Sequence, residues 1–136
     1  MEFNNSNYSI NRTENNIATT DDIISIDATH CPDLIPAFVV LAFYSPFITQ
    51  IKGTHRLINK ESNRRDVLVN VFSMLGGKIK IDGNSFIIRP STLSGGIVDS
   101  HNDHRIAMAL GIAGKVCKSP LTITRAECVN KTYPNF

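Results

Sequence analysis

The sequence has little of what marks a secreted, disulfide-bonded or membrane protein. No apolar run is long enough to span a bilayer, and the first residues lack the basic-then-apolar order of a signal peptide. The three cysteines are scattered and include no C-x-x-C pair, which favours reduced thiols over a disulfide scaffold. We therefore expect a cytoplasmic protein that does not act on a membrane.

Charge excess and the common catalytic motifs are also missing. The 136 residues carry 14 Lys and Arg against 12 Asp and Glu, and the net charge of +2 is too small to indicate a nucleic-acid partner. There is no Gly-rich phosphate loop and no G-x-S-x-G nucleophile elbow. His101 and His104 lack a third ligand nearby, so we expect no metal site.

Hydrophobic patterning predicts a mixed α/β domain behind a solvated N-terminal arm. Residues 1–20 are rich in Asn, Ser and Thr and predict a flexible arm. The whole chain is 42% hydrophobic, which is enough to bury a core. Apolar spacing and turn residues predict helices over 34–44, 61–75 and 103–116, strands over 23–28, 46–52, 97–98 and 121–124, and a hairpin over 78–89.

An internal repeat organises these elements. Residues 45–49 (SPFIT) resemble 119–123 (SPLTI), and residues 57–60 (LINK) resemble 128–131 (CVNK), at separations of 74 and 71 residues. We therefore expect a full copy of one supersecondary unit over about 22–90 and a truncated copy over about 95–136. Because Pro134 would begin another helix, we expect the chain to be a fragment.

The stretch 98–109 changes halfway from ionisable to apolar residues, which is typical of a loop leading into a buried helix. Asn102 or Asp103 can cap that helix. His104 and Arg105 then lie in its first turn, where the helix dipole disfavours a cation by roughly 0.3–1 kcal/mol. An anionic ligand bound at this helix start would explain the arrangement. An exposed helix start whose arginine pairs with a neighbouring aspartate would explain it equally.

Cations recur at three predicted helix starts. They are Lys60, Arg64 and Arg65 at the first, His104 and Arg105 at the second, and Lys131, at the repeat position of Lys60, at the third. We expect them to share a phosphate or carboxylate ligand. Surface ion pairs such as Glu61 with Arg65 are the alternative. A nucleic-acid surface is disfavoured because no aromatic residues are interleaved with the cations.

Two carboxylates accompany these cations. Asp33 lies at the start of an apolar helix, and Glu61 directly follows Lys60. Carboxylates in such surroundings can serve as general acids or bases. On spacing alone, Asp33 is equally well explained as an N-cap and Glu61 as the helical partner of Arg65.

Four motifs in this order resemble the 5-enolpyruvylshikimate-3-phosphate synthase family. They are Pro-Asp-Leu-Ile-Pro at 32–36, Lys-Glu-Ser-Asn-Arg at 60–64, Asp-Ser-His-Asn-Asp-His-Arg-Ile-Ala-Met-Ala at 99–109 and Cys-Val-Asn-Lys-Thr-Tyr-Pro-Asn-Phe at 128–136. The resemblance implies an inside-out α/β barrel domain built from βαβαββ units, in agreement with the repeat. The related UDP-N-acetylglucosamine enolpyruvyl transferase shares that fold but not this set of motifs.

The resemblance also implies a reaction. An enolpyruvyl group would pass from phosphoenolpyruvate to the 5-hydroxyl of shikimate 3-phosphate, a step of the shikimate pathway of aromatic amino acid biosynthesis. Addition would give a tetrahedral intermediate, and elimination would release phosphate, without a metal or an organic cofactor. Both substrates are polyanions, which suits a set of cationic helix starts.

Matching the motifs residue by residue implies a role for each candidate. Asp33 matches the proton acceptor near the shikimate hydroxyl, and Glu61 matches the carboxylate that exchanges a proton with the enolpyruvyl methylene. Two positions depart from the family pattern. The family usually has Asp at the position of Asn63 and commonly has Arg at the position of Ile58. The substrate-binding positions are Lys60 for shikimate 3-phosphate, Arg64, Arg105 and Lys131 for phosphoenolpyruvate, and His104 beside them.

The resemblance covers only the C-terminal part of a family with two domains, whose substrates bind between them. We therefore expect a fragment, its residues 21–136 forming part of one domain, that needs the N-terminal domain as partner and is inactive alone. Two other classes stay open. One is a module whose basic cleft face binds RNA or a protein, and the other is a fragment that only folds.

Overall fold

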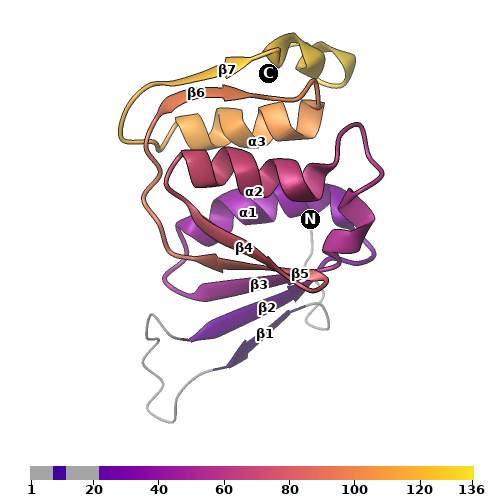
Figure 1. Ribbon diagram of the computed structural model, residues 1–136, viewed down its shortest axis with the longest axis vertical. Helices are drawn as coiled ribbons and strands as arrows, with labels where there is room; N and C mark the ends of the chain where they lie inside the picture. The colour runs from indigo at the N-terminus through magenta and orange to yellow at the C-terminus, as the bar shows by residue number, and fades with distance from the viewer. Residues whose placement is uncertain (1–7, 12–21) are drawn as a thin grey trace.

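The computed structural model describes residues 8–11 and 22–136. Three helices lie between a five-stranded sheet and a two-stranded sheet (Figure 1). The mixed α/β class predicted from the sequence is confirmed, and the described strands close no barrel. The elements are β1 Tyr8–Asn11, β2 Ile23–Asp27, α1 Ile35–Phe43, β3 Ile48–Lys52, α2 Arg64–Met74, β4 Lys78–Asp82, β5 Ser85–Arg89, β6 Gly96–Asp99, α3 His104–Gly114 and β7 Leu121–Thr124, with 3-10 turns at Pro32–Leu34, Thr54–Leu57 and Ala126–Lys131.

The same strand–helix–strand motif occurs twice. Strands β2 and β3 are parallel and joined by α1, and β6 and β7 are parallel and joined by α3. A 3-10 turn follows β3 and another follows β7. After the first motif the chain continues through α2 into the hairpin of β4 and β5, and β5 pairs antiparallel with β3. The boundaries of the two expected copies, 22–90 and 95–136, stay predictions.

The predicted N-terminal arm lies mostly outside the described residues. Within it, Tyr8–Asn11 forms β1, which pairs antiparallel with β2 at the edge of the larger sheet. No pattern in this polar stretch predicted a strand, because the pairing uses backbone groups that every sequence carries.

The core lies between the helices and the larger sheet. Leu68, Val71, Phe72 and Leu75 recur at three- and four-residue spacing, the pattern that predicted helix α2, and all four are buried. Burial of each such side chain contributes roughly 1.5–3 kcal/mol. Helix α1 is buried on most of its surface, as its nearly continuous apolar sequence predicted. In the described part of the chain, no helix combines the length and apolar content needed to cross a bilayer.

Helix α2 begins three residues later than predicted. Asn63 is its N-cap, because the Asn63 side chain accepts a hydrogen bond from the backbone N–H of Asp66. Lys60 and Glu61 therefore lie in the preceding loop. Helix α3 begins at His104 with Asp103 as its N-cap, one of the two capping residues that the sequence offered.

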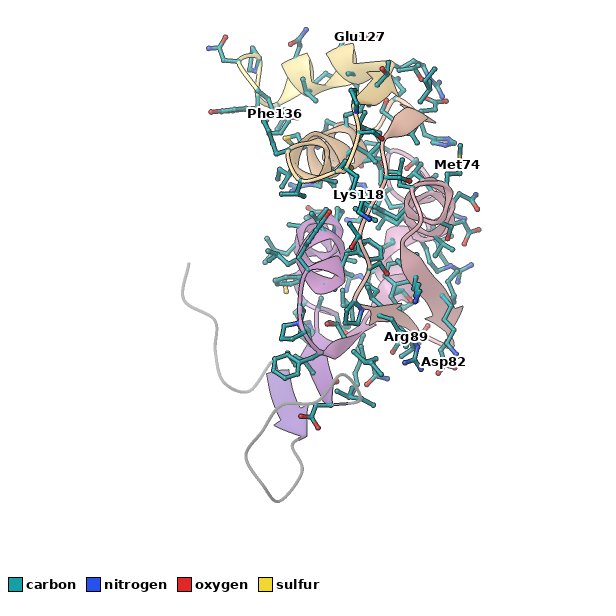
Figure 2. The ribbon with its side chains drawn as sticks, turned by 90° about the vertical axis from the view of Figure 1, so that its left-hand side faces the viewer. Met74, Asp82, Arg89, Lys118, Glu127 and Phe136 are labelled. Carbon is teal, nitrogen blue, oxygen red and sulfur yellow. The ribbon has the colours of Figure 1, made fainter. Side chains whose placement is uncertain are left out.

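The topology brings the starts of all three helices to one edge of the molecule. Strands β2, β3, β6 and β7 point toward this edge, and α1, α2 and α3 begin there, on the right-hand side of Figure 1. Figure 2 looks onto the opposite edge, where Arg89 and Lys118 lie. The segments that precede the helices, together with the first turns of α2 and α3, carry most of the predicted site residues, so the fold gathers them at one edge.

Candidate functional site

A buried ion pair joins the starts of α2 and α3. The Arg64 side chain is 1% exposed and that of Asp103 is 0% exposed. Arg64 Nε donates to Asp103 Oδ2 at 2.7 Å, and Arg64 Nη2 donates to Oδ1 at 3.1 Å. Two such bonds fix the plane of a guanidinium group as well as its position. The buried Asp103 carboxylate therefore sets the orientation of the Arg64 guanidinium group.

The Asp103 carboxylate accepts two further hydrogen bonds. Ser62 Oγ donates to Asp103 Oδ2 at 2.8 Å, and the backbone N–H of Arg105 donates to Oδ1 at 3.0 Å. Burial raises the pKa of the Asp103 carboxyl. Hydrogen bonds from Arg64 and Ser62, together with the Arg64 charge, outweigh burial and hold the pKa below its ordinary value. Asp103 is thus a charged carboxylate at the base of the site.

The outer edge of the same guanidinium contacts both candidate proton-transfer carboxylates. Arg64 Nη1 donates to Asp33 Oδ1 at 3.1 Å, and Arg64 Nη2 donates to Glu61 Oε2 at 2.5 Å. The side chains of Asp33 and Glu61 are 48% and 51% exposed. The site therefore has layers: buried Asp103, buried Arg64, and two carboxylates that reach solvent.

Asp33 attracts two more cations. Lys60 Nζ lies 3.5 Å from Asp33 Oδ1, and Arg105 Nη2 lies 3.6 Å from Oδ2. Arg105 Nη1 also donates to the backbone carbonyl of Asp33 at 3.2 Å. Burial raises the pKa of the Asp33 carboxyl, but the charges of the three surrounding cations, that of Arg105 above all, hold it below its ordinary value. We call Lys60, Arg64 and Arg105 the cation cluster.

Three of the predicted cations lie outside this cluster. Arg65 pairs with Asp66 through Nε and Oδ1 at 3.0 Å, so the alternative pair with Glu61 does not form. Lys131 is exposed at the end of the last 3-10 turn, and within residues 22–136 it forms no ion pair with Asp33, Glu61 or Asp103. His104 is half-buried in the first turn of α3.

The loop before α3 gives Asp103 its position. His101 and Asn102 both have left-handed backbone conformations, with φ of 55° and 56°, which cost a non-glycine residue free energy. Ser100 is buried, and its Oγ accepts from the Asn102 N–H and donates to the Arg125 carbonyl. Asp99 pairs with Arg125 and is therefore not the partner of Arg105.

Sequence reasoning missed two residues of the site. It treated Asp103 as a helix cap and did not single out Ser62. Polarity next to a buried helix was the available signal for Asp103, but spacing alone does not reveal a partner 39 residues away. Ser62 had no signal besides its place in the Lys-Glu-Ser-Asn-Arg motif.

The arrangement suits a compact anion and proton exchange. Three carboxylates (Asp33, Glu61 and Asp103) face three cations (Lys60, Arg64 and Arg105), and the outer members are solvent-accessible. Cations fixed at a surface can hold a phosphoryl or carboxylate group, and adjacent carboxylates can accept or donate protons. Residues 22–136 contain no group of three His, Cys, Asp or Glu placed to hold a metal ion.

Comparison with known proteins gives a consistent match. The family model described as EPSP synthase (3-phosphoshikimate 1-carboxyvinyltransferase) matches residues 3–136, a range that includes the whole site. The chain is 44% identical over 114 residues to the 3-phosphoshikimate 1-carboxyvinyltransferase of Clostridium acetobutylicum and 42% identical over 113 residues to that of Sulfurisphaera tokodaii. Each alignment covers 83% of this chain and 27% of the relative.

The structure also resembles a solved one. It matches the 2.37 Å structure of EPSP synthase from Acinetobacter baumannii with a TM-score of 0.69 and 30% sequence identity. The match covers 74% of this chain and 24% of that chain. This chain thus spans about a quarter of the length of the relatives it matches.

Proposed function

The chain belongs to the EPSP synthase family, and we propose that it forms one wall of an enolpyruvyl transferase site. The enzyme would transfer the enolpyruvyl group of phosphoenolpyruvate to the 5-hydroxyl of shikimate 3-phosphate and release phosphate. The observation that carries the proposal is the convergence of Lys60, Arg64 and Arg105 on Asp33, with Glu61 on the same guanidinium.

Each side chain would have a distinct task. Asp33 would accept the proton of the attacking hydroxyl, whose oxygen forms a bond to the central carbon of phosphoenolpyruvate. Glu61 would deliver a proton to the methylene carbon during this addition and remove one during elimination, when the bond to phosphate breaks. Both carboxylates are half-exposed and therefore accessible to a bound substrate, as groups that exchange protons with it must be.

The cations would hold the phosphoryl and carboxylate groups of the substrates. Lys60 and Arg105 are partly exposed and can contact a ligand directly, whereas Arg64 can do so only through its outer edge. We propose the same task for Lys131 and a place beside it for His104, on their match to the family motif. The balance of three cations and three carboxylates suits a small anion better than a long polyanion such as RNA.

A second wall is part of the proposal, because this chain spans about a quarter of the length of its relatives. Reactants held from one side only lose most of the advantage of fixed orientation. We therefore expect no enolpyruvyl transfer by the 136-residue chain alone, and a measured turnover would contradict this expectation.

Binding tests the proposed site directly. Titration of the chain with phosphoenolpyruvate, followed by backbone amide NMR shifts, should show weak saturable binding at the starts of α2 and α3. Arg105→Ala should lose this binding. Arg89→Ala is the control, because Arg89 is an exposed arginine at the opposite edge (Figure 2). Binding that is unchanged in Arg105→Ala would contradict the assignment, and salt-dependent RNA binding would favour an RNA-binding module.

A further inference from the structure

Ser62 ties the segment that carries Lys60 and Glu61 to the buried part of the site. Residues 58–62 belong to no helix or strand and connect the preceding 3-10 turn to the N-cap of α2. Ser62 is half-buried at the end of this 58–62 segment, and its Oγ donates to Asp103 Oδ2 at 2.8 Å. Asp103 lies 41 residues further along the chain, at the start of α3. The bond therefore fixes the segment to the second strand–helix unit.

Asp103 is a fixed acceptor for this bond. Its side chain is 0% exposed, and its two oxygens also accept from the Arg64 side chain and from the backbone N–H of Arg105. Hydrogen bonds to an ionised acceptor are roughly twice as strong as those between neutral groups. Removal of the Ser62 hydroxyl would leave Asp103 with its three other bonds, so the loss would fall on the 58–62 segment.

The ion pairs of this segment lie near the surface. Lys60 Nζ is 3.5 Å from Asp33 Oδ1, with side chains that are 27% and 48% exposed, and Glu61 is 51% exposed in its own ion pair. Ion pairs that are open to solvent contribute little to stability. At the other end of the segment, the preceding Leu57 is buried in the core. The buried contacts of Leu57 and Ser62 therefore set the course of the chain between them, and Lys60 and Glu61 lie on that stretch.

We propose that Ser62 is a positioning residue, whose hydroxyl holds Lys60 and Glu61 in the orientation that the site requires. The inference rests on the proposed function, with Lys60 as a contact of shikimate 3-phosphate. Holding a long side chain in place before its ligand arrives reduces the conformational entropy lost on binding. Arg64 and Arg105, which we assign to phosphoenolpyruvate, lie in the first turns of α2 and α3 and have their own bonds to the buried carboxylate. Their positions therefore do not depend on the Ser62 hydroxyl.

The two substrates separate a positioning role from a general loss of structure. We would titrate the 136-residue chain with shikimate 3-phosphate and with phosphoenolpyruvate in turn, and follow backbone amide NMR shifts at the starts of α2 and α3. Ser62→Ala should bind shikimate 3-phosphate about three- to tenfold more weakly than the wild type and phosphoenolpyruvate equally well. Ser62→Thr keeps the hydroxyl and should restore the affinity. Ser25→Ala is the matched control, because Ser25 Oγ donates to Gln50 Oε1 within the larger sheet, and it should change neither affinity.

A double-mutant cycle shows whether Ser62 acts through Lys60. Once Lys60→Ala has removed the ammonium group, adding Ser62→Ala should weaken shikimate 3-phosphate binding no further. Additive losses, an unchanged affinity in Ser62→Ala, a loss that threonine does not restore, or equal weakening of both substrates would each overturn the inference and leave the anion site standing. If the wild-type chain bound neither substrate, the proposed function itself would be wrong.

Discussion

Arg64 and Asp103 form a two-bond ion pair that is almost fully buried, at 2.7 and 3.1 Å, between the start of α2 and the N-cap of α3. It links the last helix of the first strand–helix unit to the helix of the second. The same guanidinium then reaches outward to Asp33 and Glu61. One pair of side chains therefore joins the two units and also positions the surface carboxylates.

Removing the Asp103 charge should cost stability more than the loss of one ordinary hydrogen bond. Asp103→Asn keeps an N-cap oxygen for the Arg105 N–H but leaves the buried Arg64 without its innermost counter-ion. We expect the free energy of unfolding to fall by about 3 kcal/mol, the lower end for a broken buried pair, because Asp33 and Glu61 still contact Arg64. Urea unfolding measures it.

Asp99→Asn is the matched control for that change. It removes the same charge at the end of strand β6, just before the loop that leads to Asp103, but the partner, Arg125, is exposed. An exposed ion pair contributes less than about 1 kcal/mol. Equal losses of stability in the two variants would show that burial does not increase the contribution of the Arg64–Asp103 pair to the free energy of unfolding.

Stability should fall in acid because of the same carboxylates. The pKa values of Asp33 and Asp103 are held below the ordinary aspartate value in the folded chain. The unfolded chain then takes up protons first as the pH falls, so the stabilisation is complete above the unfolded pKa of about 3.9 and is lost below it. Each unit by which the pKa of the buried Asp103 is lowered contributes about 1.4 kcal/mol. The contribution of the half-exposed Asp33 is smaller, because solvent screens its charge.

Urea midpoints measured from neutral pH down to acid test this sign. The wild-type midpoint should stay level until about pH 5 and then decline. The decline should be shallower in Asp103→Asn, because asparagine does not titrate. A variant curve that runs parallel to the wild-type curve at every pH would contradict a lowered pKa for Asp103.

The fold could be predicted from local patterns in the sequence. The apolar spacing in α2, the alternation in the hairpin of β4 and β5 and the turn at Gly83 and Asn84 each report local conformation, and the structure confirms these elements. The start of α2 was placed wrongly by three residues, because spacing does not tell an Asn63 cap from a residue inside the helix. Strand β1 carried no side-chain pattern at all.

The sequence predicted most of the residues that form the site, but not which of them contact one another. Motif resemblance named Asp33, Lys60, Arg64 and Arg105, and the structure brings them together. The pairings could not be predicted, since the Arg105 side chain bonds to a residue 72 positions away and not to a neighbouring aspartate. Such pairings depend on how the two strand–helix units pack, which no local pattern encodes.

Gly53, which follows strand β3, lies where the fold has no room for a side chain. Its φ is +98°, and a Cβ there would lie 2.6 Å from the backbone nitrogen of Thr29. Gly53→Ala should therefore combine backbone strain with a backbone clash and destabilise the chain by about 2–4 kcal/mol. Gly83→Ala, also at positive φ but with open space around it, should cost only about 1–2 kcal/mol. Thermal unfolding of both variants compares them, and equal costs would show that the contact with Thr29 relaxes freely.

The fork of the Arg64 side chain, and not its charge alone, should hold the site together. Four hydrogen bonds run from three of its nitrogens to three carboxylates. A lysine ammonium keeps the charge but cannot present two parallel bonds to Asp103 while reaching both outer carboxylates. Arg64→Lys should lower the free energy of unfolding by about 2–3 kcal/mol, as the buried carboxylate loses partners.

Arg65→Lys, the same change one residue along, alters only a partly exposed pair with Asp66 and should cost less than about 1 kcal/mol. Chemical denaturation of the two variants side by side decides the matter: similar losses would mean that a point charge at position 64 is sufficient.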